Sequence, residues 1–140
     1  MESVKNYDLA NVEVALKKLL KILKQKGFNW YDVKPINQSR YYIVKGYTEN
    51  LLVLFKREVF FNFGKMFKDQ GYSGVGDGIN VKDLQEAIRS YNIKTIYCLF
   101  PDEKIYYIDL QDFLIKSIKS VNKEGKEVRY ISIHEYKRLE

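Results

Sequence analysis

Hydrophobic and polar positions follow helical spacing near the start of the chain. Six apolar residues recur at intervals of three or four and form one stripe: Leu9, Val12, Leu16, Leu19, Leu20 and Leu23. Four lysines occupy the other side: Lys17, Lys18, Lys21 and Lys24. Asp8 is typical of an N-cap residue, and Gly27 is typical of the residue that follows a helix. The pattern predicts an amphipathic helix over residues 8–26.

The positions that follow are typical of β-strands. Residues 28–34 and 39–46 are rich in aromatic and β-branched side chains and predict two strands, the first ending before Pro35. Residues 51–55, Leu-Leu-Val-Leu-Phe, are apolar at every position, as in a strand buried on both faces. Residues 59–63 fit either a further strand or the start of a helix.

Turn signals divide the second half of the chain. The glycines of residues 71–78 predict a flexible surface loop. Asn80 is expected to cap a helix over residues 81–91. Residues 94–100 and 104–108 flank Pro-Asp-Glu and predict a hairpin.

The C-terminal part completes the predicted order. Asp109 opens a helix whose apolar positions continue to Val121, and residues 127–131 predict a strand. Ser132 and Glu135 have the spacing of a capping box for a short terminal helix. This order favours an α/β fold, with α+β as the alternative. We expect a single domain over residues 1–140 with one central mixed sheet flanked by helices.

Composition excludes several classes of protein. The chain of 140 residues has the length of one domain. A single cysteine, Cys98, cannot form an internal disulfide, and with one histidine, His134, a Cys/His zinc site is excluded. No apolar run approaches the roughly 18 residues of a membrane span, and the N-terminus lacks the apolar core of a signal peptide. We therefore expect a soluble, intracellular, cytoplasmic protein with no membrane partner.

The net charge of +6 is distributed unevenly. Residues 1–70 hold 13 basic and 7 acidic side chains, whereas residues 71–140 hold 11 of each. Such asymmetry is typical of a protein that binds nucleic acid, and DNA is the expected partner. The alternative is a lysine-rich surface that only aids solubility. The residues expected to contact nucleic acid are Arg40, Lys45, Lys56, Arg57, Lys65 and Lys68.

The order of elements resembles the restriction-endonuclease-like fold, the PD-(D/E)XK superfamily that includes archaeal Holliday junction resolvases. An opening helix carries Glu13 and ends in Lys-Gly-Phe at residues 26–28, and short strands, a buried strand ending in lysine, a helix and a further strand follow. The resemblance covers residues 8–100 in architecture. It implies a site in which an Asp on one strand and a Glu-x-Lys on the next hold Mg²⁺.

The motif of that family is incomplete in this chain. Lys56 stands at the end of the buried strand, but Leu54 occupies the position of the acid, and Ile-Val-Lys at residues 43–45 also lacks one. Residues 101–104 spell Pro-Asp-Glu-Lys, but they lie in the predicted hairpin turn. The resemblance therefore implies a decayed metal site, and we predict no metal ligands.

Three functions remain open. The first is a nucleic-acid-binding protein on a nuclease-like fold that lacks robust cleavage. The second is an active Mg²⁺-dependent nuclease with an unusual layout of acids, for which the candidate catalytic residues are Glu13, Asp32 and Lys56, with Glu49 as a further acid. The third is a small interaction or structural module, such as a homodimer, whose interface uses the 12 Tyr, 8 Phe and 1 Trp.

Overall fold

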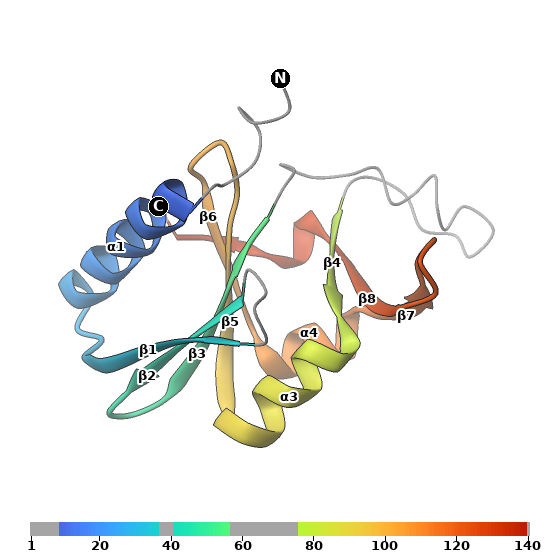
Figure 1. Ribbon diagram of the computed structural model, residues 1–140, viewed down its shortest axis with the longest axis horizontal. Coiled ribbons are helices and arrows are strands. Elements are labelled where there is room, and N and C mark those ends of the chain that lie inside the picture. Colours follow the sequence, from blue (N-terminus) through green and yellow to red (C-terminus); the bar gives the residue numbers. More distant parts are fainter. Residues whose placement is uncertain (1–8, 37–40, 57–75, 140) are drawn as a thin grey trace.

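The computed structural model of the chain describes residues 9–36, 41–56 and 76–139, and it has a mixed α/β fold (Figure 1). Three α-helices, one 3₁₀ turn and nine strands lie in this part of the chain. In order, they are α1 (Leu9–Gln25), β1 (Trp30–Ile36), β2 (Tyr41–Gly46), β3 (Asn50–Phe55), β4 (Gly76–Asn80), α3 (Val81–Tyr91), β5 (Ile93–Leu99), β6 (Ile105–Asp109), α4 (Leu110–Lys116), β7 (Ile118–Val121), β8 (Glu127–Ser132), η3 (Ile133–Glu135) and β9 (Lys137–Arg138).

The strands form two sheets rather than the single sheet predicted. The larger sheet is mixed, with the order β1-β2-β3-β5-β6-β9, and only the β3–β5 pair is parallel. The smaller sheet, β4-β8-β7, is antiparallel. The expectation of one sheet was wrong because β8 pairs with β4 and β7, and only the two-residue β9 returns to the edge of the larger sheet.

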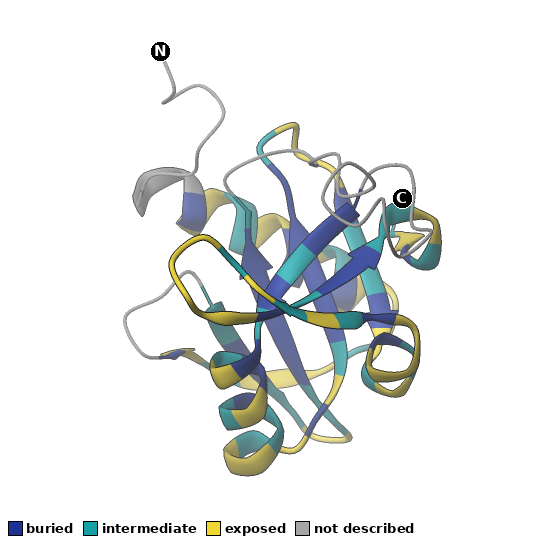
Figure 2. Ribbon diagram, turned by 90° about the vertical axis from the view of Figure 1, so that its right-hand side faces the viewer, coloured by how far each residue is buried: buried dark blue, intermediate teal, exposed yellow. Residues whose placement is uncertain are grey.

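Strand β3 lies in the middle of the larger sheet and contributes to a hydrophobic core on each face. Leu51, Val53 and Phe55 pack in the core that α1 covers. Leu52 and Leu54 point the other way, into a core shared with α3, α4 and the smaller sheet. This alternation confirms the prediction of a strand buried on both faces, because successive side chains of a strand point to opposite sides. Figure 2 shows buried residues concentrated along these strands.

Helix α1 forms as its apolar stripe predicts. Its buried residues are Val12, Leu19, Leu20 and Leu23. At its C-terminus Gly27 has a φ of 93°, and the Phe28 amide donates to the carbonyl of Leu23. Glycine adopts this left-handed conformation without the steric cost of a Cβ atom.

Helix α3 and the hairpin that follows were also predicted correctly. The Asn80 side chain accepts a hydrogen bond of 3.2 Å from the Asp83 amide, which caps α3 at the expected position. Strands β5 and β6 form the antiparallel pair expected around the Pro-Asp-Glu turn. None of the helices in the described part of the chain is long and apolar enough to span a membrane.

Strand β1 passes through Pro35, where the sequence predicted its end. Pro35 lies opposite Tyr42 of β2, and β1 is the first strand of its sheet. An edge strand tolerates proline because the missing N–H can face away from the ladder. The predicted boundary was therefore wrong by two residues.

The end of the glycine-rich stretch is a strand and not part of a surface loop. Gly76 and Gly78 belong to β4, while Gly71 and Gly74 lie outside the described residues. Gly78 is opposite Tyr130 of β8, and a Cβ atom at position 78 would lie 2.9 Å from the Tyr130 ring. This glycine therefore serves close packing between strands.

The predicted helix from Asp109 to Val121 is split in the structure. Helix α4 ends at Lys116, and the following residues form β7, whose half-buried Ile118 packs beside Val128 and Tyr130. Pairing with β8 satisfies the β7 backbone. The terminal helix is a single 3₁₀ turn, where Ser132 Oγ accepts from the His134 amide at 3.3 Å.

Candidate functional site

A buried ion pair joins the two sheets beside the end of β3. The Nζ atom of Lys56 lies 3.0 Å from Oδ2 of Asp77 and donates to the carbonyl of Gly78 at 2.6 Å. The side chains of Lys56 and Asp77 are only 12% and 11% exposed. Lys56 follows β3 of the larger sheet and Asp77 lies on β4 of the smaller one, so the pair links the sheets.

The ion pair keeps Lys56 in its charged form. Burial is the largest single influence and would lower the pKa of the ammonium group. The charge of Asp77, its hydrogen bond to Lys56 and the interactions with Tyr41 and Cys98 together outweigh burial and hold the pKa above its ordinary value. A lysine that retains its proton acts neither as a nucleophile nor as a general base at neutral pH.

Three further polar side chains interact electrostatically with the ion pair: Tyr41, Cys98 and Tyr136. The Cys98 thiol donates to the Tyr136 hydroxyl at 3.6 Å, and the Tyr41 hydroxyl accepts from the Asn80 amide at 3.3 Å. Burial is the largest cause that raises the pKa of Cys98, to about 12. A buried, protonated thiol is inert as a nucleophile, so the chemistry of this cluster favours a structural role.

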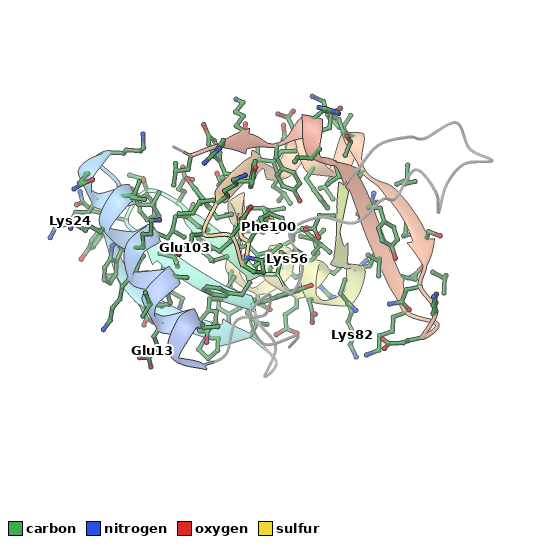
Figure 3. The ribbon with its side chains drawn as sticks, turned by 90° about the horizontal axis from the view of Figure 1, so that it is seen from above. Glu13, Lys24, Lys56, Lys82, Phe100 and Glu103 are labelled. Atoms are coloured by element: carbon green, nitrogen blue, oxygen red, sulfur yellow. The ribbon has the colours of Figure 1, made fainter. Side chains whose placement is uncertain are left out.

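The three candidate catalytic residues do not meet. Glu13 is exposed on α1, which covers one face of the larger sheet, whereas Lys56 is paired with Asp77 on the other side (Figure 3). Asp32 lies on β1 opposite Lys45, at the end of the sheet where β3 begins. Lys56 follows the opposite end of β3.

The remaining acids of the motif analysis also lie apart from Lys56. Glu49 precedes β3, and its carboxylate accepts from the Thr95 hydroxyl at 3.2 Å. Leu54, at the position of the family's acid, is fully buried in the core. Among the residues that the structure describes, no group of three or more His, Cys, Asp or Glu side chains is placed to hold a metal ion.

Two of the predicted nucleic-acid contacts can be located. Lys45 is half-buried, and its ammonium lies 5.6 Å from the centre of the Tyr91 ring. Lys56 was expected at an exposed strand end, but it is mostly buried because Asp77 and Gly78 engage its ammonium group. The other four predicted contacts lie outside the described residues: Arg40, Arg57, Lys65 and Lys68.

The exposed lysines of α1 form a basic surface in the described part of the chain. Lys17, Lys21 and Lys24 are all exposed, and at about 100° per residue they fall within an arc of about 60° around the helix. We call these three residues the lysine face of α1. Glu13 is the only acidic residue of the helix. The sequence predicted that these lysines share one side of the helix, but it favoured a solvent-exposed face without ligand contact.

Asp77 was not singled out by sequence analysis. It lay in a stretch that was interpreted as a loop, and nothing in its local sequence indicates a partner 21 positions earlier in the chain. Comparisons of the chain with protein-family models, with curated proteins and with solved structures found no match.

Proposed function

We propose that this protein binds nucleic acid, with DNA as the expected form, through phosphate contacts made by the lysine face of α1. The observation that carries the proposal is the concentration of exposed positive charge on this helix, which has one acidic residue along its 17 positions. Lys18 is also exposed on α1, but it lies 3.9 Å from Glu103, so it is partly neutralised.

The geometry suits a phosphate backbone. At about 1.5 Å per residue, the lysine face from Lys17 to Lys24 spans about 10 Å along α1. Duplex DNA carries one charge per about 1.7 Å of its axis, so several phosphates lie within reach of three lysines. Neutralising them releases counterions, which favours binding at low salt without sequence preference.

The order of elements supports a nuclease-like fold as part of the proposal. The elements that support it are α1, the antiparallel strands β1–β3, and α3, which comes after β4 and precedes a strand parallel to β3. We propose that the chain has this architecture without robust cleavage. Leu54 cannot ligate a cation, and Lys56 is engaged by Asp77.

The two alternative functions are less well supported. An active nuclease would need carboxylates beside Lys56 that can hold a cation. Asp77 lies there but is engaged by the Lys56 ammonium, and Glu13, Asp32 and Glu49 lie elsewhere. A homodimer would need an extended apolar interface, and the outward side of α1 is predominantly charged.

A salt titration tests phosphate binding directly. Fluorescence anisotropy with a labelled duplex should give an affinity that falls linearly with salt on a log–log plot, by about 0.9 per phosphate neutralised. Three to five contacts predict a slope of about −3 to −4.5. No binding at low salt, or a flat slope, would overturn the proposal.

A double variant that reverses two charges tests whether α1 makes the contact with nucleic acid. Lys17→Glu with Lys24→Glu should weaken binding strongly, because the two lysines lie seven residues apart on one side of α1. Lys82→Glu with Arg89→Glu is the matched control, since both residues are exposed, lie seven residues apart on α3, and α3 is separate from α1 (Figure 3). Equal losses in the two variants would contradict a contact through α1.

A further inference from the structure

Three aromatic side chains are exposed together at one corner of the larger sheet. Trp30, Tyr31 and Tyr47 are 37%, 56% and 73% exposed. The ring centres of Tyr31 and Tyr47 lie 5.0 Å apart with an interplanar angle of 46°. The Tyr47 amide donates to the Asn29 carbonyl at 3.2 Å, and Trp30 is opposite Gly46, so the backbone holds the three residues together. We call these three side chains the aromatic corner.

Their exposure needs an explanation because the other aromatic residues in the described part of the chain are buried or half-buried. Phe100 and Phe113 are fully enclosed in the core. An exposed tyrosine pair leaves two large apolar ring surfaces in water, and clustered exposure of this kind marks binding surfaces. Single exposed hydrophobic residues are ordinary, but three aromatic rings at one corner are not.

The surroundings of the aromatic corner are basic. Four residues separate the end of α1 from Trp30, and the connection between α1 and β1 lies at the same end of the sheet as the β2–β3 hairpin (Figure 1). Lys24 and Lys26 are exposed at this end of α1, so the lysine face leads toward the corner. Of the nearby acids, Asp32 lies on β1 at the register position opposite Lys45, and the Glu49 carboxylate accepts from the Thr95 hydroxyl.

We propose that the aromatic corner binds unpaired bases of single-stranded nucleic acid. Every base has a π face that stacks on tyrosine or tryptophan, and positive charge beside such rings tracks the backbone. In this arrangement the lysine face of α1 holds phosphates while Tyr31, Tyr47 and Trp30 receive bases. The inference rests on the proposed function and adds the form of nucleic acid that is preferred.

A second copy of this chain fits the aromatic corner less well. Strand β1 is an edge strand, and pairing between edges would be the simplest route to a dimer. Pro35 lacks the N–H needed for pairing, and Lys34 places a charge on the same edge. Both features oppose addition of another strand. The surrounding lysines would also repel their copies, whereas they attract a polyanion.

The single tryptophan of the chain supplies a direct readout. Because Trp30 belongs to the aromatic corner, stacking of a base should quench the intrinsic fluorescence of the protein. We expect a 12-nucleotide single strand of DNA or RNA to quench it saturably, and the corresponding duplex to bind through phosphates with little quenching. Tighter binding of single strand than of duplex at equal salt is the expected result.

Substitution of the tyrosines separates stacking from charge. Tyr31→Ala with Tyr47→Ala should weaken single-strand binding by about tenfold or more for each base stack lost. Tyr31→Phe with Tyr47→Phe keeps both π faces and should restore the affinity. Ile115→Ala is the control, because Ile115 is exposed on α4 and lies outside the aromatic corner. Circular dichroism checks that each variant is folded.

The outcomes distinguish this inference from the function on which it rests. If single strand and duplex both fail to bind at low salt, the proposed function and the inference both fall. If duplex and single strand bind equally, and the alanine variant matches the wild type, the inference alone is overturned. If the alanine variant instead turns a dimer into a monomer in sedimentation, the aromatic corner is a self-association surface and the inference is wrong.

Discussion

The ammonium of Lys56 and the carboxylate of Asp77 lie 3.0 Å apart inside the protein. This side-chain ion pair connects two sheets whose described strands share no backbone pairing with one another. Lys56 also donates to the carbonyl of Gly78 on the same strand as Asp77. Removing one charge of a buried pair is costly because the other remains in a region of low dielectric constant. The pair therefore has consequences for stability that can be measured.

Lys56→Met should destabilise the protein by about 3–5 kcal/mol, because methionine keeps the apolar stem but leaves the Asp77 carboxylate buried without its cation. Chemical denaturation of wild type and variant measures the difference. In the double variant Lys56→Met, Asp77→Leu the buried charge is gone, and much of the stability should return. If the stability lost in the double variant equals the sum of the losses in Lys56→Met and Asp77→Leu, the ion pair contributes no coupling energy.

The stability of the fold should fall as the solution becomes alkaline. The folded pKa of Lys56 is above its ordinary value of 10.5, so its stabilisation is complete below that value and is lost as pH rises through the folded pKa. Cys98 acts in the same direction, because its thiol stays protonated in the fold while the unfolded thiol ionises from about its ordinary pKa of 9.0. Denaturant midpoints from pH 7 to pH 11 measure this, and a constant midpoint would contradict it.

The Cys98 thiol should be protected from reagents that modify thiolates. It is fully buried, and burial raises its pKa to about 12, so almost no thiolate exists at pH 8 in the folded state. We expect alkylation by iodoacetamide to proceed only as fast as the protein opens. Rapid labelling in native buffer, with no acceleration on adding denaturant, would show that the thiol is accessible.

We expect no robust cleavage of DNA in the presence of Mg²⁺ or Mn²⁺. Leu54 cannot ligate a cation, and the Asp77 carboxylate is engaged by the Lys56 ammonium. A hard cation there keeps its waters and activates none of them efficiently. The assay uses plasmid, junction and single-stranded substrates. Cleavage that is lost in Glu13→Gln or Asp32→Asn would establish the nuclease with an unusual layout of acids.

Local sequence patterns predicted most of the helices and strands in the described part of the chain. The stripe of α1, the cap at Asn80 and the fully apolar β3 each depend on neighbouring residues, so a single sequence suffices to find them. The same holds for the lysine face of α1, since helical geometry alone gathers Lys17, Lys21 and Lys24. Helical spacing could not show that the fold leaves these lysines exposed.

Contacts between segments distant in the sequence decided the features that local patterns did not predict. Asp77 and Lys56 are 21 positions apart, and they meet because β4, which pairs with β8, packs beside the end of β3. The change from helix to strand after Lys116 likewise depends on β8 as a partner. The sequence by itself determined the periodic elements, because periodicity is a local property. The tertiary structure alone decided which polar side chains are buried together, because burial depends on packing between segments that the chain order does not join.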